Sequence, residues 1–332
     1  MKPVFIIAEV GMAHDGSLGV AHAFIDAVAD TGVDAIKYQT HIAEAESTDA
    51  EPFRVNFSYE DVNRFSYWKR TQFTREQWQA LRKHSLEKGL EFMSTPFSLE
   101  AVELLKGIGV QKWKVGSAEA SYASLIDTLV SFRQPIFLST GLVGFTEIEK
   151  LVKRVQHLSP DLTLMQCTTM YPSPPERVGL NVLQEFRERY SYPVGLSDHS
   201  GTIFPGLASV ALGASAVEVH VTLSENMFGP DVQASLTIEN LKNLVTGIRF
   251  LEKVQAYPVD KEQVQRELVA TAQVFSRSCY AGRNLTEGDK VCESDIVMKK
   301  AGNKSFDVSE IVGKRLNRDI VADTPINKED VE

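Results

Sequence analysis

The sequence predicts a (β/α)8 barrel followed by a small, mostly β domain. Short apolar runs of strand length alternate eight times with amphipathic helical segments, and eight such units in about 250 residues are typical of this barrel. Polar residues recur at the end of nearly every apolar run, as the mouth of a barrel requires. After Val254 the alternation gives way to short β-like segments separated by turn residues.

The predicted strands are short and mostly apolar, and each is followed by a turn and a helical segment. Short runs that are apolar on both faces are typical of strands buried in a parallel sheet. In chain order they cover Val4–Val10, Asp34–Gln39, Leu90–Thr95, Val110–Val115, Pro135–Thr140, Leu162–Cys167, Tyr192–Leu196 and Ala214–Val219.

The segments between the strands place apolar residues at helical spacing. The first helix is predicted over Leu18–Thr31. Thr74 with Gln77, and Thr146 with Glu149, have the spacing of a capping box and predict the first turns of two more helices. The remaining helices are expected over Ser98–Gly107, Tyr122–Ser131, Asn181–Arg189, Phe204–Leu212 and Ile238–Val254.

A doubly wound open sheet is the alternative architecture, but no Gly-x-Gly-x-x-Gly motif follows the first strand. A long polar insertion, His41–Gln72, separates the second strand from its helix. A loop of this length in a compact domain is usually a functional lid or an interface, and the sequence leaves these two roles open. The insertion carries the aromatic residues Phe53, Phe57, Tyr59, Phe65, Tyr67 and Trp68.

The chain therefore divides into a barrel over residues 1–254, a linker with a helical stretch over 255–272, and a small domain over 273–332. A domain of about 60 residues is near the lower limit for independent folding, so we expect it to lean on the barrel or on a partner chain. Its predicted β segments are Ser278–Ala281, Leu285–Asp289, Ile296–Met298, Ile311–Gly313 and Ile320–Val321.

Composition narrows the class of protein. The 332 residues are 43% hydrophobic and carry a formal net charge of −9, so a nucleic-acid partner is not expected. Cys167, Cys279 and Cys292 are odd in number and far apart, which indicates a reducing compartment rather than a disulfide framework or a cysteine zinc site. The first apolar run is too short for a leader or a membrane span, so we expect a cytoplasmic protein without a membrane partner.

Two lysines point to an anion site. Lys37 and Lys114 lie inside or just after apolar strands, where a lone ammonium is costly to bury unless it is paired. One such lysine is explained more simply by an exposed edge. Two of them, with the hydroxyls of Thr95, Ser117 and Ser197 at neighbouring strand ends, favour a site for a phosphate or a carboxylate.

Two histidines point to a metal site. His199 and His220 follow the ends of the seventh and eighth predicted strands. Either alone is equally well explained as a buried histidine bonded to a carbonyl, but together they favour a divalent cation. Two imidazoles with oxygen ligands suit Mn²⁺, Mg²⁺, Fe²⁺ or Co²⁺ better than a closed zinc site. Asp198 and Glu218 are candidates for orienting the rings, and Asp231 adds a nearby carboxylate.

Glu9, Glu119 and Asp231 are the candidate acids, bases or hydroxyl-binding groups. Glu9 lies within an apolar run, so it is either a desolvated acid or the ion-pair partner of Lys37 on the next strand. Tyr171 begins a proline-rich loop, which either supplies an aromatic rim to the site or is an ordinary loop between a strand and a helix.

The strand-end motifs occur in a fixed order along nearly the whole chain. They are Ile7-Ala8-Glu9-Val10-Gly11, Lys37-Tyr38-Gln39-Thr40, Ser94-Thr95-Pro96-Phe97, Lys114-Val115-Gly116-Ser117-Ala118-Glu119, Leu138-Ser139-Thr140-Gly141, Cys167-Thr168-Thr169-Met170-Tyr171-Pro172, Gly195-Leu196-Ser197-Asp198-His199, Glu218-Val219-His220-Val221-Thr222 and Gly229-Pro230-Asp231. This ordered set resembles the sialic acid synthase family, the phosphoenolpyruvate-condensing enzymes that make nonulosonic acids. The final residues resemble that family's antifreeze-like (SAF) domain.

The resemblance implies a metal-dependent condensation. Carbon C3 of phosphoenolpyruvate attacks the aldehyde of an open-chain N-acylated hexosamine, water adds at C2, and phosphate leaves by C–O cleavage. The resemblance assigns Mn²⁺, with Mg²⁺ or Co²⁺ as alternatives, to His199 and His220, and a catalytic carboxylate to Glu9. It assigns phosphoenolpyruvate to Lys37, Thr95, Lys114, Ser117, Thr169 and Ser197. It assigns the sugar to Gln39, Glu119, Tyr171, Asp231 and Lys300.

Several positions depart from the family pattern. Thr169 stands where the family has asparagine, and Val232-Gln233 replaces a His-Lys pair after Asp231. The family's SAF domain carries an arginine that reaches into a neighbouring subunit's site, and Lys300 in Lys299-Lys300-Ala301-Gly302 takes its place. Lysine keeps the charge but loses the planar fork. The resemblance therefore also implies a domain-swapped homodimer with altered contacts to the sugar.

The sequence leaves the acceptor sugar open. N-acetylmannosamine is the leading candidate, and a 2,4-diacetamido-trideoxyhexose, which would give legionaminic or pseudaminic acid, is the alternative. A non-catalytic carbohydrate- or ice-binding protein is the alternative of a different class, and another metal-dependent barrel aldolase or hydrolase is a third. The paired lysines and paired histidines argue against a binding protein, which has no use for a metal beside an anion site.

Overall fold

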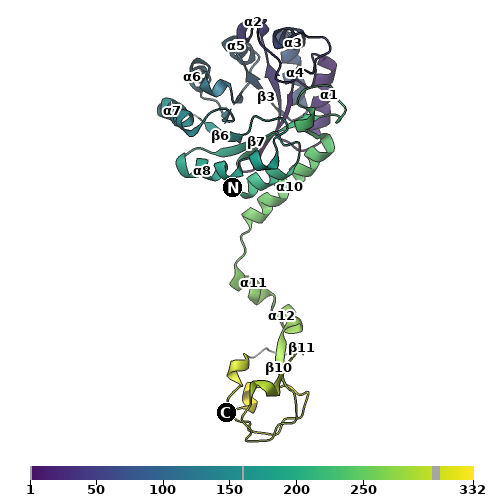
Figure 1. Cartoon of the computed structure of the whole chain (residues 1–332), viewed down its shortest axis with the longest axis vertical. Helices are drawn as coiled ribbons and strands as arrows, with labels where there is room; N and C mark the ends of the chain where they lie inside the picture. The colour runs from purple at the N-terminus through teal and green to yellow at the C-terminus, as the bar shows by residue number, and fades with distance from the viewer. Residues whose placement is uncertain (1, 159–160, 301–306) are drawn as a thin grey trace. The chain divides into compact units, whose positions relative to one another are not determined.

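The structure is a computed structural model that describes residues 2–158, 161–300 and 307–332. The chain separates into two compact units, Met1–Tyr257 and Pro258–Glu332 (Figure 1). Within the described residues, no helix is both long enough and apolar enough to cross a membrane.

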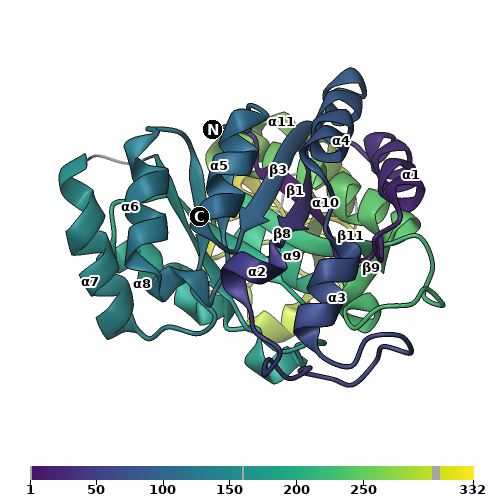
Figure 2. The same ribbon diagram turned by 90° about the horizontal axis from the view of Figure 1, so that it is seen from above.

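The first unit is a closed barrel of parallel strands, which confirms the predicted fold class. Each of the first eight strands pairs in parallel with the next, and β8 pairs back to β1 with Glu9 beside His220. Figure 2 shows the helices arranged around the strands. The strands are β1 Phe5–Gly11, β2 Ala35–Thr40, β3 Glu91–Pro96, β4 Trp113–Val115, β5 Ile136–Ser139, β6 Leu162–Cys167, β7 Val194–Asp198 and β8 Ala216–Thr222, and a short β9, Ser235–Thr237, adds to β8.

The helices of the barrel lie close to their predicted positions. Thr74 caps α4 as predicted, since its hydroxyl accepts from the Gln77 amide and the Gln77 side chain accepts from the Thr74 amide. The capping box predicted at Thr146 is wrong, because the helix already begins at Phe145 and leaves Thr146 inside its first turn. The helices are α1 Leu18–Ala29, α4 Arg75–Glu87, α5 Leu99–Gly107, α6 Ala123–Ser131, α7 Phe145–Val155, α8 Leu180–Arg189, α9 Phe204–Ala211 and α10 Ile238–Ala256.

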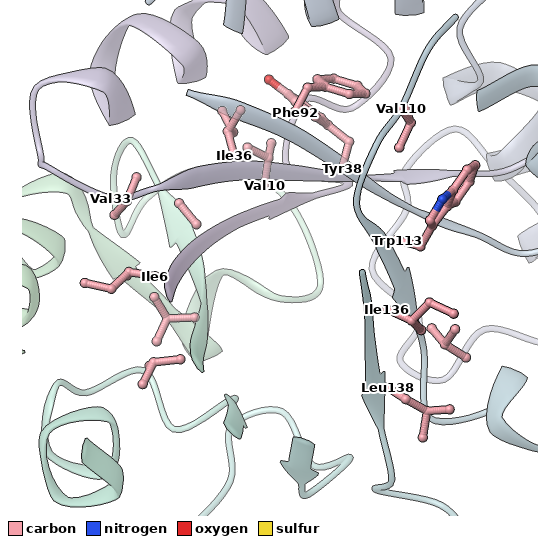
Figure 3. Close-up of a cluster of buried hydrophobic side chains, with 14 of the residues drawn as sticks. Ile6, Val10, Val33, Ile36, Tyr38, Phe92, Val110, Trp113, Ile136 and Leu138 are labelled. Atoms are coloured by element: carbon pink, nitrogen blue, oxygen red, sulfur yellow. The ribbon is translucent and has the colours of Figure 1, made fainter. Parts of the chain in front are cut away.

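The strands present two apolar layers, because successive side chains of a strand point to opposite faces. The outer layer packs against the helices and includes Tyr38 of β2 and Trp113 of β4 (Figure 3). The inner layer, which we call the inner floor, fills the barrel with buried side chains. It consists of Ile7, Ala35, Met93, Phe137, Met165 and Ala216, with Phe5 beside them.

The polar side chains that line the cavity follow the inner floor along the strands. Residues two positions further along a strand point to the same face. On six strands that position holds a polar or ionisable side chain that lines the cavity described below: Glu9, Lys37, Thr95, Ser139, Cys167 and Glu218. The barrel therefore carries a polar layer directly beyond its apolar floor, toward the carboxyl ends of the strands.

The insertion His41–Gln72 packs on the barrel of its own chain. It contains two short helices, α2 Ala43–Glu46 and α3 Arg64–Thr71. Arg70 of α3 bonds to Asp61 and to Asp15 in the loop after β1. The apolar side chains of the insertion form a cluster of their own, with Met12, Ala43, Tyr67 and Trp68 buried and Phe53, Phe57 and Phe65 packed against them.

The second unit has its own small core. Two further helices, α11 Lys261–Glu267 and α12 Val269–Phe275, include the helical stretch predicted before the small domain. The strands β10 Arg277–Ala281 and β11 Ile296–Lys300 pair antiparallel. The strand predicted at Ile311–Gly313 is wrong, because that segment is a turn that buries Ile311. The core comprises Cys279, Ala281, Leu285, Val291, Ile311, Leu316, Ile320, Ile326 and Val331.

Candidate active site

A cavity of about 350 Å³ opens at the carboxyl ends of the barrel strands. Every site residue predicted within the barrel lines it, which places the two histidines and the two lysines around one volume. Residues of the insertion, including Arg54 and Trp68, line the same cavity. The predicted residues in its wall are Glu9, Lys37, Gln39, Thr95, Lys114, Ser117, Glu119, Thr169, Tyr171, Ser197, His199, His220 and Asp231.

Lys300 belongs to the second unit. It ends β11, and its ammonium lies 5.5 Å from the centre of the Phe275 ring. The following Ala301 and Gly302 of the predicted motif lie outside the described residues.

Two lysines and two carboxylates form a buried charge cluster at the cavity base. Lys37 is ion-paired with Glu9, and the Lys37 and Lys114 ammonium groups each lie 3.6 Å from Glu218 Oε1. All four side chains are at most 5% exposed. We call these residues the charge quartet, and their formal charges sum to zero. Of the two possibilities for Glu9, the structure forms the ion pair with Lys37.

Electrostatic contacts within the quartet favour the ionised forms of Glu218 and Lys37. Burial alone would raise the pKa of Glu218, but Lys114 and Lys37 hold it below its usual value. Burial alone would lower the pKa of Lys37, but Glu218 and Glu9 raise it. Hydroxyl groups complete the shell, since Lys37 donates to Thr95 Oγ1 at 3.1 Å and Lys114 donates to Ser139 Oγ at 2.7 Å.

Glu218 is the member of the quartet whose role the sequence reasoning missed. It was expected to orient a histidine ring, but it contacts both lysines and accepts from Ser197 Oγ at 3.2 Å. The alternation of side chains along a strand could have placed Glu218 in the cavity, because it lies two residues before His220 and therefore on the same face of β8.

The two histidines form a pair in the wall of the cavity. Their ring centroids are 5.2 Å apart. Burial, and then the charge of His220, lower the pKa of His199 to about 3. The His199 Nδ1 atom lies 3.0 Å from the Thr168 carbonyl oxygen, which can only accept, so Nδ1 carries the proton and Nε2 keeps its lone pair. A neutral imidazole held in this way is a ready metal ligand.

The carboxylates expected beside the histidines bond to other groups. Asp198 accepts from the amide and the hydroxyl of Ser200, and burial raises its pKa to about 6. Asp231 pairs with Arg54 at 2.8 Å. Within the described residues, no group of three or more His, Cys, Asp or Glu side chains is placed to hold a metal ion. The protein therefore offers two imidazoles to a cation, which leaves coordination positions for water or substrate.

Arg54 of the insertion is a second residue that the sequence reasoning missed. Besides its pairing with Asp231, its guanidinium lies 4.3 Å from the centre of the Tyr171 ring. Tyr171 in turn packs against His199, with ring centroids 4.2 Å apart. Arg54 thus bridges two residues expected to bind the sugar. No periodic pattern marks it, because it lies in a loop.

The remaining predicted residues have contacts of their own in the cavity wall. Gln39 donates from Nε2 to Glu9 Oε1 at 3.0 Å, and burial raises the pKa of Glu119. Ser117 Oγ accepts from the Gly141 amide at 2.9 Å. A Cβ atom at Gly141 would collide with the hydroxyls of Ser117 and Thr169, so a glycine is required where these two hydroxyls meet.

Comparison with known proteins identifies the family. The model of the NeuB family matches residues 24–260, which is most of the chain. This chain belongs to the NeuB family. The model of the SAF domain matches residues 276–332, so this NeuB family member carries the small domain that the sequence analysis expected.

Relatives and a solved structure cover nearly the whole of the NeuB family chain. It is 31% identical over 322 residues to an N,N'-diacetyllegionaminic acid synthase of Campylobacter jejuni, covering 95% of this chain and 96% of the relative. It is 31% identical to a synthase of the same name from Legionella pneumophila, covering 99% and 94%. A crystal structure of the N-acetylneuraminic acid synthetase of Leptospira borgpetersenii superposes with a TM-score of 0.72 at 28% identity, covering 82% of this chain and 93% of that one.

Proposed function

We propose that this NeuB family protein condenses phosphoenolpyruvate with an open-chain N-acylated hexosamine to give a nonulosonic acid and phosphate. The observation that carries the proposal is the placement of the charge quartet and the histidine pair in one cavity. The names of the relatives, all synthases of this class of sugar acid, support the product class.

The quartet end of the cavity is the proposed phosphoenolpyruvate site. Lys37 and Lys114 supply two ammonium groups there. Because Glu9 and Glu218 already balance these charges, we expect hydroxyl donors to carry much of the recognition of the phosphate and carboxylate oxygens. The proposed donors are Thr95, Ser117, Thr169 and Ser197.

The histidine pair is the proposed cation site. His199 and His220 would hold Mn²⁺, with Mg²⁺ or Co²⁺ as alternatives, since two imidazoles leave the remaining positions to the oxygen ligands that these ions favour. When bound, the cation would polarise the aldehyde oxygen and position water. The two rings fit such a group because both line the cavity and His199 keeps a lone pair on Nε2.

Glu9 lies where the two ends of the site meet. It contacts Lys37 on the phosphoenolpyruvate side and Gln39 on the sugar side. The reaction joins C3 of phosphoenolpyruvate to the aldehyde carbon, adds water at C2 and breaks the C2–O bond to phosphate. We assign to Glu9 the carboxylate that holds or moves a proton at this junction.

The sugar end is proposed to comprise Gln39, Glu119, Tyr171 and Asp231, with Lys300 of a partner chain in a homodimer. N-acetylmannosamine is the proposed acceptor. The names of the Campylobacter and Legionella relatives favour a 2,4-diacetamido-trideoxyhexose as a second candidate. A protein that remains monomeric during full turnover would rule out the contribution of Lys300 from a partner.

Phosphate release tests the proposed function directly. The protein is incubated with phosphoenolpyruvate, Mn²⁺ and a panel of N-acyl hexosamines that includes both candidate acceptors. We expect sugar-dependent phosphate release that EDTA abolishes, and the sugar with the highest kcat/KM identifies the acceptor. No release with any sugar, or release that survives EDTA, would contradict the proposal.

Replacing Arg54 with alanine is expected to raise the KM for the acceptor about 10- to 100-fold, because hydrogen bonds to charged groups contribute about 1.5–3 kcal/mol. The KM for phosphoenolpyruvate should not change, since Arg54 contacts Tyr171 and Asp231 rather than the quartet. The matched control is Arg64→Ala, which removes another cavity-lining arginine whose partners are Glu51 and Trp68. Equal effects of the two variants on the acceptor KM would contradict this role.

A further inference from the structure

A chain of hydrogen bonds joins the insertion to the proposed catalytic carboxylate. Glu46 Oε1 lies 2.5 Å from His41 Nδ1, and His41 Nε2 lies 3.4 Å from Gln39 Oε1. Gln39 Nε2 then donates to Glu9 Oε1 at 3.0 Å. These hydrogen bonds therefore run from α2 through His41, directly after β2, and through β2 to β1, and each is partly buried.

The directions of these hydrogen bonds follow from Glu9, the last residue of the series. A carboxylate only accepts, so the Gln39 amide must turn its nitrogen toward Glu9 and its oxygen toward His41. That oxygen and the Glu46 carboxylate also only accept, so His41 must donate from both ring nitrogens, from Nδ1 to Glu46 and from Nε2 to Gln39. The opposite orientation of the amide would place its oxygen against Glu9, with two acceptors facing each other. A proton on His41 Nε2 thus supports the orientation of Gln39 that the Glu9 carboxylate requires.

The surroundings of His41 hold its ring in place. It is stacked between Trp68 of α3, at 3.7 Å between ring centroids, and Phe97, at 4.2 Å. Glu46 is itself held, since its second oxygen accepts from the Ile42 amide at 3.4 Å. The His41 and Glu46 side chains are only 3% and 8% exposed. The insertion therefore supplies both the partner and one of the two stacking rings of His41.

We propose that His41, held by Glu46, is a positioning residue that orients Gln39 and through it Glu9. The insertion is then part of the active site. The catalytic consequence rests on the proposed function, because Glu9 and Gln39 have their assigned roles only in that reaction. The directions of the hydrogen bonds do not depend on the proposed function.

The kinetic test uses His41→Phe, which keeps an aromatic ring between Trp68 and Phe97 but has no N–H. We expect kcat to fall on the order of 10- to 100-fold and the KM for the acceptor to rise, since a loosely held Glu9 and Gln39 are misplaced. The KM for phosphoenolpyruvate should not change, because the lysines remain. A variant with unchanged kcat would overturn the proposal.

Variants of Glu46 separate positioning from a structural role. In Glu46→Gln the new amide can donate to His41 Nδ1 and leave the proton on Nε2, so kcat should stay close to that of the wild type. Glu46→Leu offers no partner and should lose activity as His41→Phe does. Glu51→Leu, in the same insertion but bonded to Arg64 and Trp68, is the control and should keep kcat. Equal losses of kcat in Glu46→Gln and Glu46→Leu would overturn the proposal.

A measurement without turnover tests the polarity of the chain. In ¹⁵N-labelled protein the imidazole resonances of His41 are assigned by their loss in His41→Phe. We expect Nε2 to be of the protonated type, and an unprotonated Nε2 would overturn the proposal. If the wild-type protein releases no phosphate with any sugar, the proposed function fails, whereas the resonance of Nε2 still decides whether the chain has this polarity.

Discussion

Replacing His199 with alanine is expected to remove the proposed Mn²⁺ site and to abolish sugar-dependent phosphate release. The protein offers two imidazoles to the cation, and within the described residues no third His, Cys, Asp or Glu completes a cluster around them. Loss of one imidazole therefore leaves a single protein ligand. Charge stabilisation by a catalytic metal contributes several kcal/mol, so we expect a loss of turnover on the order of 1000-fold.

Titration of the protein with Mn²⁺, followed by electron paramagnetic resonance, tests the same variant without turnover. His199→Ala should bind Mn²⁺ much more weakly than the wild type. The control is His157→Ala, which removes an exposed histidine that does not line the cavity. Unchanged Mn²⁺ binding by His199→Ala would exclude this histidine as a ligand, whatever the effect on turnover.

The barrel could be predicted because its strands follow a simple period. Alternate residues of a buried strand face either the helices or the barrel interior. Lys37 and Lys114 stand out from apolar runs, and the parallel closure of β1 to β8 brings both to one cavity. Local chemistry and strand parity were sufficient here, so these residues could be placed before the structure was known.

The contacts that the sequence did not reveal connect distant segments. Arg54 and Asp231 are 177 positions apart, and no local pattern indicates that a loop after β2 meets a loop after β8. The same limit affected the capping boxes. Thr74 and Thr146 have equal spacing to a glutamine or a glutamate, but Gly144 provides the helix start ahead of Thr146. Tertiary packing determines such loop contacts and helix starts, and a short sequence motif carries no information about that packing.

The charge balance of the quartet leads to a further expected result. Lys114→Met should abolish phosphoenolpyruvate-dependent turnover and lower the free energy of unfolding. The substitution leaves Glu9 and Glu218 buried with only Lys37 between them. Removing one partner of a buried ion pair costs about 3–5 kcal/mol, which a shift in the urea unfolding midpoint should reveal. The surface variant Lys153→Met is the control for both measurements.

A second substitution separates stability from function. In Lys114→Met/Glu218→Gln one lysine faces one carboxylate, so the cluster is again neutral and most of the lost stability should return. Turnover should not return, because the ammonium proposed to bind phosphoenolpyruvate is still missing. A double variant no more stable than Lys114→Met would show that the unpaired carboxylate is not the cause of the destabilisation. A double variant that regains turnover would show that the anion site does not need Lys114. The two variants thus separate two roles of the quartet. Its neutral charge is expected to determine stability, and its lysines are expected to bind phosphoenolpyruvate.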